Sequence, residues 1–334
     1  DKPYNQVTFR TAGPSAMSIP VGLDDDLSAM LLNNDVDPEV PEGTEYYLPA
    51  GSSYRVTPFA LMKGFRLAGS RDGVKPIVVL EGSWSIAEGS YLSSLEFDNI
   101  EFRHEANNNY FMNTSKAYTI ENVSFVNCDF ISLRRGFWRH QSANAKYIMN
   151  LEMEGCRFEG CGWQTSAYGA FNLQSFDKDN GVSYDQVDRA IFRNCTFSND
   201  NDGTNGYGWG NLFYAPYMDK PIDLEYKNVT IYNYSRNQRL INIESAVGSK
   251  LVMEGILLAS PCGDLFAIGA NTTTTFSNNY TTADYTLGGK NMNATDLKIT
   301  AVELFADPAN GDLTIKDTSS PIVSNRAGDT RWLP

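Results

Sequence analysis

One six-residue phrase recurs along the middle of the chain and constrains its fold more than any other feature. It contains an apolar residue, a spacer, Asn or Gly, a small apolar residue, a second spacer, and Phe or an aliphatic residue. The six copies begin at Phe97, Phe125, Met153, Phe192, Tyr226 and Met253. Their steps are 28, 28, 39, 34 and 27 residues, and a recurrence of this kind is typical of repeat architectures.

A second short strand with alternating apolar and polar residues follows each copy. These strands are Tyr110–Asn113, Phe137–His140, Ala170–Leu173, Asn211–Tyr214, Leu240–Ile243 and Leu265–Ile268. No segment between them has helical periodicity, and one repeat cannot bury its own apolar face, whereas stacked repeats can. We therefore predict an all-β fold, a single-stranded right-handed parallel β-helix. A β-propeller is the alternative, but its blades of about 40 to 45 residues exceed steps of 27 or 28 residues.

Two positions of the phrase have a direct physical interpretation. The Asn or Gly position suits a left-handed bend, and stacked Asn amides can bond one another along the coil. The next position is occupied by Cys in three copies, Cys128, Cys156 and Cys195. Free Cys is usually buried, so we expect these side chains to point inward as small apolar groups. The apolar residues that begin the six copies should form one interior column.

The phrase is absent beyond about residue 277, where the chain becomes rich in Asn and Thr. We expect a lead-in over residues 1–45, the β-helix over 46–274, and a C-terminal capping segment over 275–334. An open β-helix end exposes strand edges and apolar interior, so a cap is needed. Within it, Trp332 should pack against apolar surface, and Arg331 should bond a carboxylate or a backbone carbonyl.

Charge and composition narrow the class of partner. The chain has 27 Lys and Arg against 40 Asp and Glu, a formal charge of −13, which disfavours nucleic-acid binding. No apolar run approaches the roughly 20 residues that a membrane helix needs, so we expect a soluble chain whose export signal or anchor has been removed. Eight N-x-S/T sequons include two within the packed repeat, at Asn194 and Asn228, which indicates a bacterial origin.

Three segments together resemble a known family. They are Leu48–Gly51, Gly64–Gly69 and the closing motif Gly328-Asp329-Thr330-Arg331-Trp332. The chain, over roughly residues 40–334, resembles the pectin-lyase-like β-helix proteins of gut Bacteroidetes that end in Gly-Asp-x-Arg-Trp, most of which have no known function. The resemblance implies a lipoprotein encoded in a polysaccharide-utilisation locus, anchored at the outer membrane and facing the cell surface or the periplasm, where it handles a complex glycan.

An arginine-rich stretch is the main candidate for catalysis. A polysaccharide lyase needs positive charge to neutralise a uronate and a base to remove the neighbouring proton. Arg134, Arg135 and Arg139 gather here beside His140. Alternation places Trp138 and His140 inside and Arg139 outside, which favours a buried histidine and surface ion pairs. A glycoside hydrolase would need paired carboxylates, and only one appears among eight outward positions of the second strands.

A loop over residues 198–206 carries oxygen-bearing side chains at alternate positions, including Asp200 and Asp202. These two residues are the candidate calcium ligands. The Glu that a calcium loop requires at its twelfth position is replaced by Asn211, so an ordinary Asx-rich turn without a cofactor is favoured.

Binding is the simplest function for such a coil, because outward residues repeat at about 4.8 Å, comparable with one sugar ring. The candidate glycan-binding residues are Arg139, Asn172, Phe213 and Asn242 on the strands and Trp163, Tyr168, Tyr207 and Trp209 on the loops. Rings and amides suit the apolar face and hydroxyl rim of a sugar. We therefore expect a monomeric, non-catalytic, polysaccharide-binding protein. The alternatives are a lyase or hydrolase acting on pectin-like or other uronate-containing glycan, and a structural coil without a sugar ligand.

Overall fold

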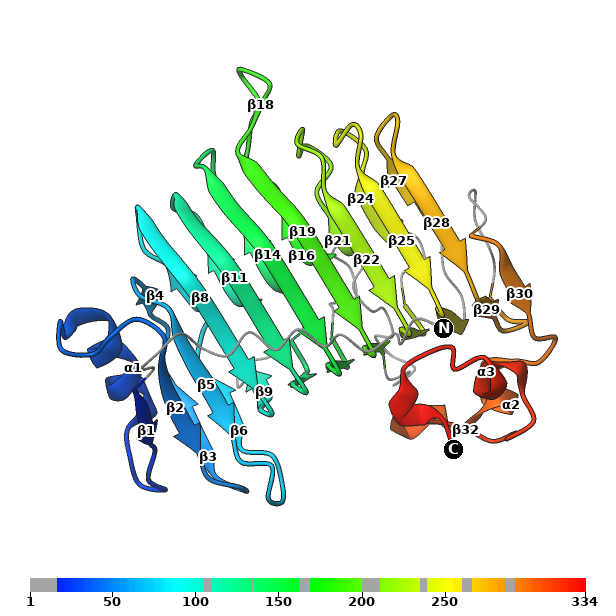
Figure 1. The fold of residues 1–334 in the computed structure, drawn as a ribbon, viewed down its shortest axis with the longest axis horizontal. Helices are drawn as coiled ribbons and strands as arrows, with labels where there is room; N and C mark the ends of the chain where they lie inside the picture. The colour runs from blue at the N-terminus through cyan, green and yellow to red at the C-terminus, as the bar shows by residue number, and fades with distance from the viewer. Residues whose placement is uncertain are drawn as a thin grey trace, which may run out of the picture.

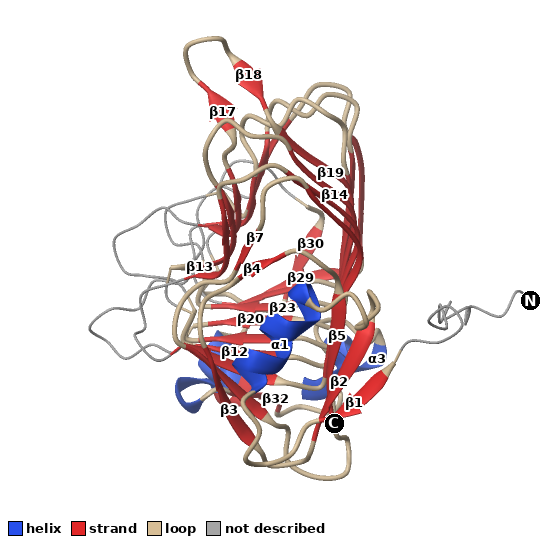
Figure 2. Cartoon of the chain, turned by 90° about the vertical axis from the view of Figure 1, so that its left-hand side faces the viewer, coloured by secondary structure: helices blue, strands red, loops and turns tan. Residues whose placement is uncertain are grey.

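Stacked parallel strands dominate the computed structural model of the protein. The structure describes residues 17–104, 110–133, 135–161, 169–199, 211–234, 239–259, 266–285 and 292–334. Successive coils stack along the horizontal axis of Figure 1. Seen from the N-terminal end in Figure 2, the chain runs clockwise as it recedes from the viewer. The protein is therefore a right-handed parallel β-helix, and the predicted fold is confirmed.

The chain visits three sheets in turn, which we name sheets I, II and III. Among the described residues, sheet I has ten strands: β1 (Ser18–Pro20), β2 (Thr44–Leu48), β5 (Phe65–Gly69), β8 (Ser90–Asp98), β11 (Tyr118–Val126), β14 (Lys146–Glu154), β19 (Asp185–Arg193), β22 (Asp223–Lys227), β25 (Lys250–Glu254) and β28 (Thr273–Ser277). Sheet II has ten described strands: β3 (Ser53–Val56), β6 (Ile77–Leu80), β9 (Glu101–His104), β12 (Asp129–Ile131), β15 (Arg157–Glu159), β20 (Thr196–Ser198), β23 (Thr230–Tyr232), β26 (Leu257–Ala259), β29 (Asn279–Thr281) and β30 (Ala294–Asp296).

Sheet III is the shortest of the three. Its six described strands are β10 (Tyr110–Thr114), β13 (Gly136–His140), β16 (Gly169–Leu173), β21 (Asn211–Tyr214), β24 (Ile241–Ile243) and β27 (Phe266–Ile268). The remaining strands are β4 (Ala60–Leu61), β7 (Ser85–Ile86), β17 (Phe176–Asp177), β18 (Val182–Ser183), β31 (Phe305–Asp307) and β32 (Asp312–Ile315). The described helices are α1 (Leu27–Val36), α2 (Ala301–Leu304), α3 (Pro321–Ser324), η1 (Pro308–Asn310) and η2 (Thr330–Trp332).

The predicted apolar column runs along the interior of sheet I without a break. Its six members pair in register from β8 to β25, and each is at most 1% exposed. The rings of Phe97 and Phe125 stack with centroids 4.8 Å apart, and those of Phe192 and Tyr226 stack at 4.5 Å. Repetition of the same residue type at one register therefore builds a continuous core, as the sequence predicted.

The bend between sheets I and II is left-handed in every copy of the phrase, with φ between 48° and 65°. The bend residues are Asn99, Asn127, Gly155, Asn194, Asn228 and Gly255. Asn and Gly tolerate this conformation best among the amino acids. The Asn127 side chain donates to Asn99 Oδ1 at 2.6 Å, so successive bends are also linked. At Gly255 a Cβ would lie 2.4 Å from Asn228 Oδ1, which leaves no room for a side chain.

The three cysteines that follow the bend lie inside the coil. Cys128, Cys156 and Cys195 are fully buried and carry free thiols. All three belong to the main apolar core of the coil. Their predicted role as small apolar side chains is confirmed.

Helix α1 covers the first coil at the N-terminal end (Figure 2). The Asp26 side chain accepts a hydrogen bond from the Ala29 N–H and thereby caps the helix. Leu27 and Leu31 are buried in the main core of the coil. The helix therefore shields apolar interior that the first strands would otherwise expose.

The C-terminal segment lies along the outer face of sheet II (Figure 1). Strands β28, β29 and β30 continue sheets I and II, so the boundary expected at residue 274 falls within β28. Beyond β30 the chain builds a second apolar core, in which Phe305 and Leu313 pack with Tyr232, Leu257 and Tyr280 of sheet II. The segment thus covers the side of the last coils, where sheet II presents outward apolar residues, whereas a cap across the open end was expected.

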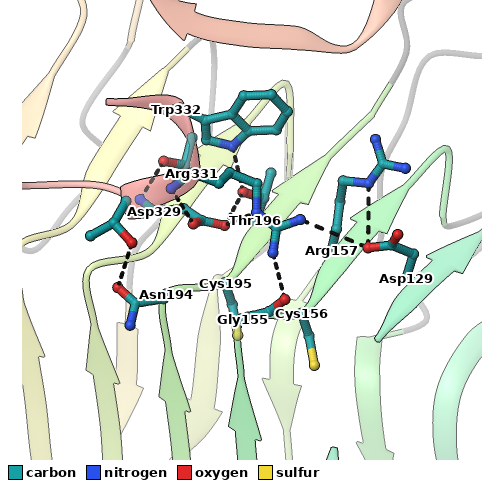
Figure 3. Close-up of polar contacts among 12 residues, drawn as sticks. Asp129, Gly155, Cys156, Arg157, Asn194, Cys195, Thr196, Asp329, Arg331 and Trp332 are labelled. Atoms are coloured by element: carbon teal, nitrogen blue, oxygen red, sulfur yellow. Dashed lines mark hydrogen bonds and ion pairs between the residues drawn. The ribbon is translucent and has the colours of Figure 1, made fainter. Parts of the chain in front are cut away.

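The closing motif, residues 328–332, docks on sheet II farther toward the N-terminal end, and we call it the clasp (Figure 3). Thr196 Oγ1 donates to the Asp329 carboxylate at 2.7 Å, and the Asp329 N–H donates to Thr230 Oγ1 at 2.9 Å. Trp332 Nε1 donates to Thr196 Oγ1 at 2.7 Å. Two outward threonines on neighbouring strands therefore hold the clasp.

Arg331 extends the clasp across further coils (Figure 3). Its guanidinium donates to the Gly155 carbonyl and pairs with the Asp329 carboxylate at 3.0 Å. A longer ion pair, at 3.8 Å, joins it to Asp129. Trp332 packs against the second apolar core. The contacts expected for Arg331 and Trp332 are therefore confirmed, on the side of the coil.

Candidate functional site

The outward side chains of sheet III form a row along the coil axis. Arg139 on β13 pairs in register with Asn172 on β16, and Asn172 pairs with Tyr214 on β21. Tyr214 pairs in turn with Asn242 on β24. Because neighbouring strands lie about 4.8 Å apart, the row repeats at that interval. We call these four residues the sheet III face.

Phe213 was predicted to belong to this row, and that prediction is wrong. Its register partners are Phe171 and Ile241, it is 0% exposed, and its ring lies 5.8 Å from that of Phe171. Aligning β21 one residue out of register exchanges the inner and outer faces of the strand. Burial of the large apolar ring fixes the true register, and Tyr214 takes the outward position.

An aromatic ring and two arginines mark the N-terminal end of the face. The guanidinium of Arg139 lies 5.4 Å from the centroid of the Tyr110 ring, and that of Arg135 lies 5.9 Å from it. Such cation–π contacts attach both arginines to the same ring. Gly136 makes the arrangement feasible, because a Cβ there would lie 2.8 Å from the Tyr110 ring. This end of the face is therefore positively charged.

Amide groups in the middle of the face have unused hydrogen-bonding capacity. The Asn172 side chain accepts a hydrogen bond from Gln174, yet its Nδ2 has no partner among the described residues, although Asn172 is only 1% exposed. Asn113, the register neighbour of Arg139, likewise has an Oδ1 without a described partner. Buried polar groups are normally paired, so these two atoms mark unsatisfied hydrogen-bonding capacity just beneath the surface of the face.

A second aromatic cluster borders the face near β21. The rings of Phe176 and Tyr217 stack with centroids 4.3 Å apart, and both are partly exposed. Burial raises the pKa of Tyr214, and the nearby Tyr217 and Glu244 raise it further. The phenol of Tyr214 is therefore neutral and lies close to the stacked pair. Aromatic groups thus lie at the β10 end of the face and beside β21.

A closed polar network lies behind the face. His140 Nε2 is 2.6 Å from the Tyr118 hydroxyl, and His140 Nδ1 is 2.7 Å from Asp185 Oδ1. Both His140 and Asp185 have fully buried side chains. Burial lowers the pKa of His140, although the Asp185 carboxylate opposes the shift. The inward orientation predicted for His140 is confirmed, and a substrate on the outer face does not reach it.

Several predicted site residues fall outside the described part of the chain: Arg134, Trp163, Tyr168, Asp200, Asp202, Tyr207 and Trp209. Their roles stay predictions. Across the residues that the structure does describe, no three His, Cys, Asp or Glu side chains are placed to share a metal ion.

The structure adds aromatic residues that the sequence analysis missed. Tyr110, Tyr214, Phe176 and Tyr217 join the predicted Arg139, Asn172 and Asn242. One signal was readable in the sequence, because Gly136 and Gly169 stand at the same register as Tyr110. A glycine beside a large outward ring on the neighbouring strand leaves space for that ring. The Phe176–Tyr217 stack joins strand β17 to the loop after β21 and has no comparable local signal.

Comparison with known proteins adds no relative. The chain matches no protein-family model and no curated protein sequence. Each described helix is too short or too polar to cross a lipid bilayer.

Proposed function

We propose that the protein binds a polysaccharide along the sheet III face without cleaving it. The observation that carries the proposal is the row itself, in which Arg139 and Tyr214 are partly exposed, the buried amides of Asn172 and Asn242 occupy the strands on either side of Tyr214, and the Phe176–Tyr217 stack lies near β21. Aromatic rings suit the apolar faces of sugars, and side-chain amides suit their hydroxyl groups. The strand interval of about 4.8 Å would let an extended glycan meet one side chain per sugar.

The local charge indicates the class of glycan. Arg135 and Arg139 lie together at one end of the face and favour an acidic sugar there, against a net charge of −13 for the whole chain. A monomer at the cell surface or in the periplasm, held at the outer membrane by a lipid and serving a polysaccharide-utilisation system of Bacteroidetes, is part of the same proposal. That part rests on the sequence resemblance over residues 40–334.

One observation favours the enzymatic alternative, a lyase for uronate-containing glycan. The two arginines supply the positive charge that neutralisation of a uronate requires. The nearest phenol, that of Tyr110, belongs to a residue only 1% exposed, and His140 is fully buried. Tyr110 and His140 therefore do not supply a base in contact with substrate, and Arg135 and Arg139 would have to serve both as base and as neutralising charge, so binding without cleavage is the better supported function.

The test is retention of the intact protein in affinity gels that contain polygalacturonate or neutral polysaccharides. The variant Arg139→Ala/Tyr214→Ala should be retained at least tenfold less by the acidic polymer, since one aromatic contact plus one ionic contact is worth about 1.4 kcal/mol or more. Tyr47→Ala, an exposed tyrosine on β2, is the matched control and should behave as the intact chain. Unchanged retention of the double variant would show that the binding site does not lie on the sheet III face.

Absorbance of unsaturated products, measured with and without calcium, separates the two functions. Retention without product is expected. Product formation would establish the lyase instead.

A further inference from the structure

The outer face of sheet I carries tyrosines on alternate strands. In the register shared by β8, β11, β14 and β19, one outward row reads Tyr91, Thr119, Tyr147 and Gln186. Tyr91 is 55% exposed, and Tyr147 is partly exposed. Two strand intervals amount to about 9.6 Å, so the two rings lie roughly that far apart along the coil.

Each of these rings is fixed by a carboxylate on the next strand. The Tyr91 hydroxyl donates to Glu121 on β11, and the Tyr147 hydroxyl donates to Asp188 on β19. Both carboxylates lie two residues beyond the strand partner of the tyrosine. Each phenol must therefore lean over the neighbouring strand to reach its acceptor, which turns one side of the ring toward solvent. A ligand would meet rings that are already ordered, which lowers the entropic cost of binding.

The named side chains around the rings are polar, and their net charge is negative. Asn122 and Asn150 occupy an adjacent outward row, where Asn150 Nδ2 donates to Asn122 Oδ1 at 3.3 Å. The neighbouring cation Arg189 lies 3.4 Å from Glu152 and is thereby compensated. Carboxylates and amide oxygens accept hydrogen bonds from hydroxyl groups, and the carboxylates repel a uronate. This surface therefore differs in charge from the arginine-bearing end of the sheet III face.

We propose that the outer face of sheet I is a second glycan-binding surface, for a neutral, extended β-1,4-linked polysaccharide whose alternate sugars stack on Tyr91 and Tyr147. In such a chain, successive sugars turn over, so every second ring presents the same face. Rings on every second strand match that repeat, with one sugar per strand interval. The Asn row and the two carboxylates lie where the sugar hydroxyls project. The proposal is independent of the sheet III face, because it uses another sheet and the opposite charge.

Titration calorimetry tests the proposal with cellohexaose, xylohexaose and mannohexaose as probes. The intact chain should bind at least one of them, and Tyr91→Ala/Tyr147→Ala should bind it at least tenfold more weakly. Each single variant should lose part of the affinity. The matched control is Tyr47→Ala, which removes another exposed tyrosine of sheet I and should keep full affinity.

Two further results distinguish this surface from the sheet III face. Tyr91→Ala/Tyr147→Ala should retain polygalacturonate as the intact chain does, and Arg139→Ala/Tyr214→Ala should keep its affinity for the neutral hexaose. Failure of the intact chain to bind any of the three probes would overturn the proposal. Equal affinity of the intact chain and the tyrosine double variant, with both shown to be folded by circular dichroism, would overturn it as well.

Discussion

Sheets II and III are built by the same coils at the same strand spacing, yet their outer faces differ in what covers them. On sheet II, Thr196 and Thr230 bond the clasp and Leu257 packs in the second core, so this face receives the chain's own C-terminal segment. On sheet III, the outward row presents Arg139 and Tyr214, both partly exposed. The two sheets have the same backbone geometry. The side chains at the outward register therefore determine which face the C-terminal segment covers and which face stays partly exposed.

Removal of the segment that covers sheet II should have the largest effect on the protein. A chain ending at residue 296 would expose Tyr232, Leu257 and Tyr280, which form the floor of the second core. Contiguous exposed apolar surface promotes association, so this chain should aggregate. Size-exclusion chromatography with light scattering measures the outcome, with full-length Arg139→Ala/Tyr214→Ala as the control that should elute like the intact protein. A truncated chain that elutes as a single small species and melts at the original temperature would contradict the contrast between the faces.

Breaking the clasp alone should have an intermediate effect. Asp329→Ala removes the acceptor for Thr196 and Arg331 and leaves buried donors unpaired, at a cost of about 1 to 3 kcal/mol. Urea denaturation should show a correspondingly lower free energy of unfolding. Asp312→Ala, an exposed position in β32 of the same segment, should change that free energy little. Equal effects of the two substitutions would show that the clasp contributes nothing specific to stability.

The two regions should also differ in the direction of their pH dependence, which is the smallest expected effect. Burial lowers the pKa of His140 behind sheet III, so the unfolded chain takes up the proton more readily, and stability is lost as pH falls below the ordinary value of 6.5. Burial raises the pKa of Asp329 in the clasp, so its contribution is lost as pH rises above 3.8.

Unfolding free energies measured from pH 4 to pH 8 check these signs. His140→Gln should reduce the slope between pH 5 and 7, by up to about 1.4 kcal/mol per pH unit, whereas Asp329→Asn should act at lower pH. Two variants with the same pH profile as the intact chain would show that neither group is linked to folding.

The register and the buried face of sheet I were predicted correctly because the repeated phrase contains two diagnostic residues at a fixed spacing. The bend residue, such as Asn127, and the apolar residue two positions earlier, Phe125, jointly set register and face. Between sheets II and III, the described residues with left-handed backbone are Ser132, Gly160 and Asn233, which share no residue type and lie at different distances before the next strand. The segments before the strands of sheet III differ in length, so the position of the repeated phrase does not predict the register of β21. For this reason Phe213 was assigned to the outward position that Tyr214 occupies.

The candidate site was predictable only in part, because the repeated phrase does not set the register of sheet III. Arg139, Asn172 and Asn242 were assigned to the correct face, since local alternation of polar and apolar residues suffices within one strand. The stack of Phe176 on Tyr217 was not predictable, because two segments about 40 residues apart meet only after the coil has formed. The docking position of the clasp was not predictable either. In the sequence, Thr196 and Thr230 do not differ from other outward residues of short strands.

The left-handed bend between sheets I and II makes the coil a modular unit. Residues 127–154 run from one bend residue to the position before the next, span 28 residues and contain β12, β13 and β14. An in-frame duplication of this segment would add one strand to each sheet and leave every bend at an Asn or Gly. Gene duplication within the coding sequence is therefore a simple route by which a coil of this kind gains length while keeping the same fold.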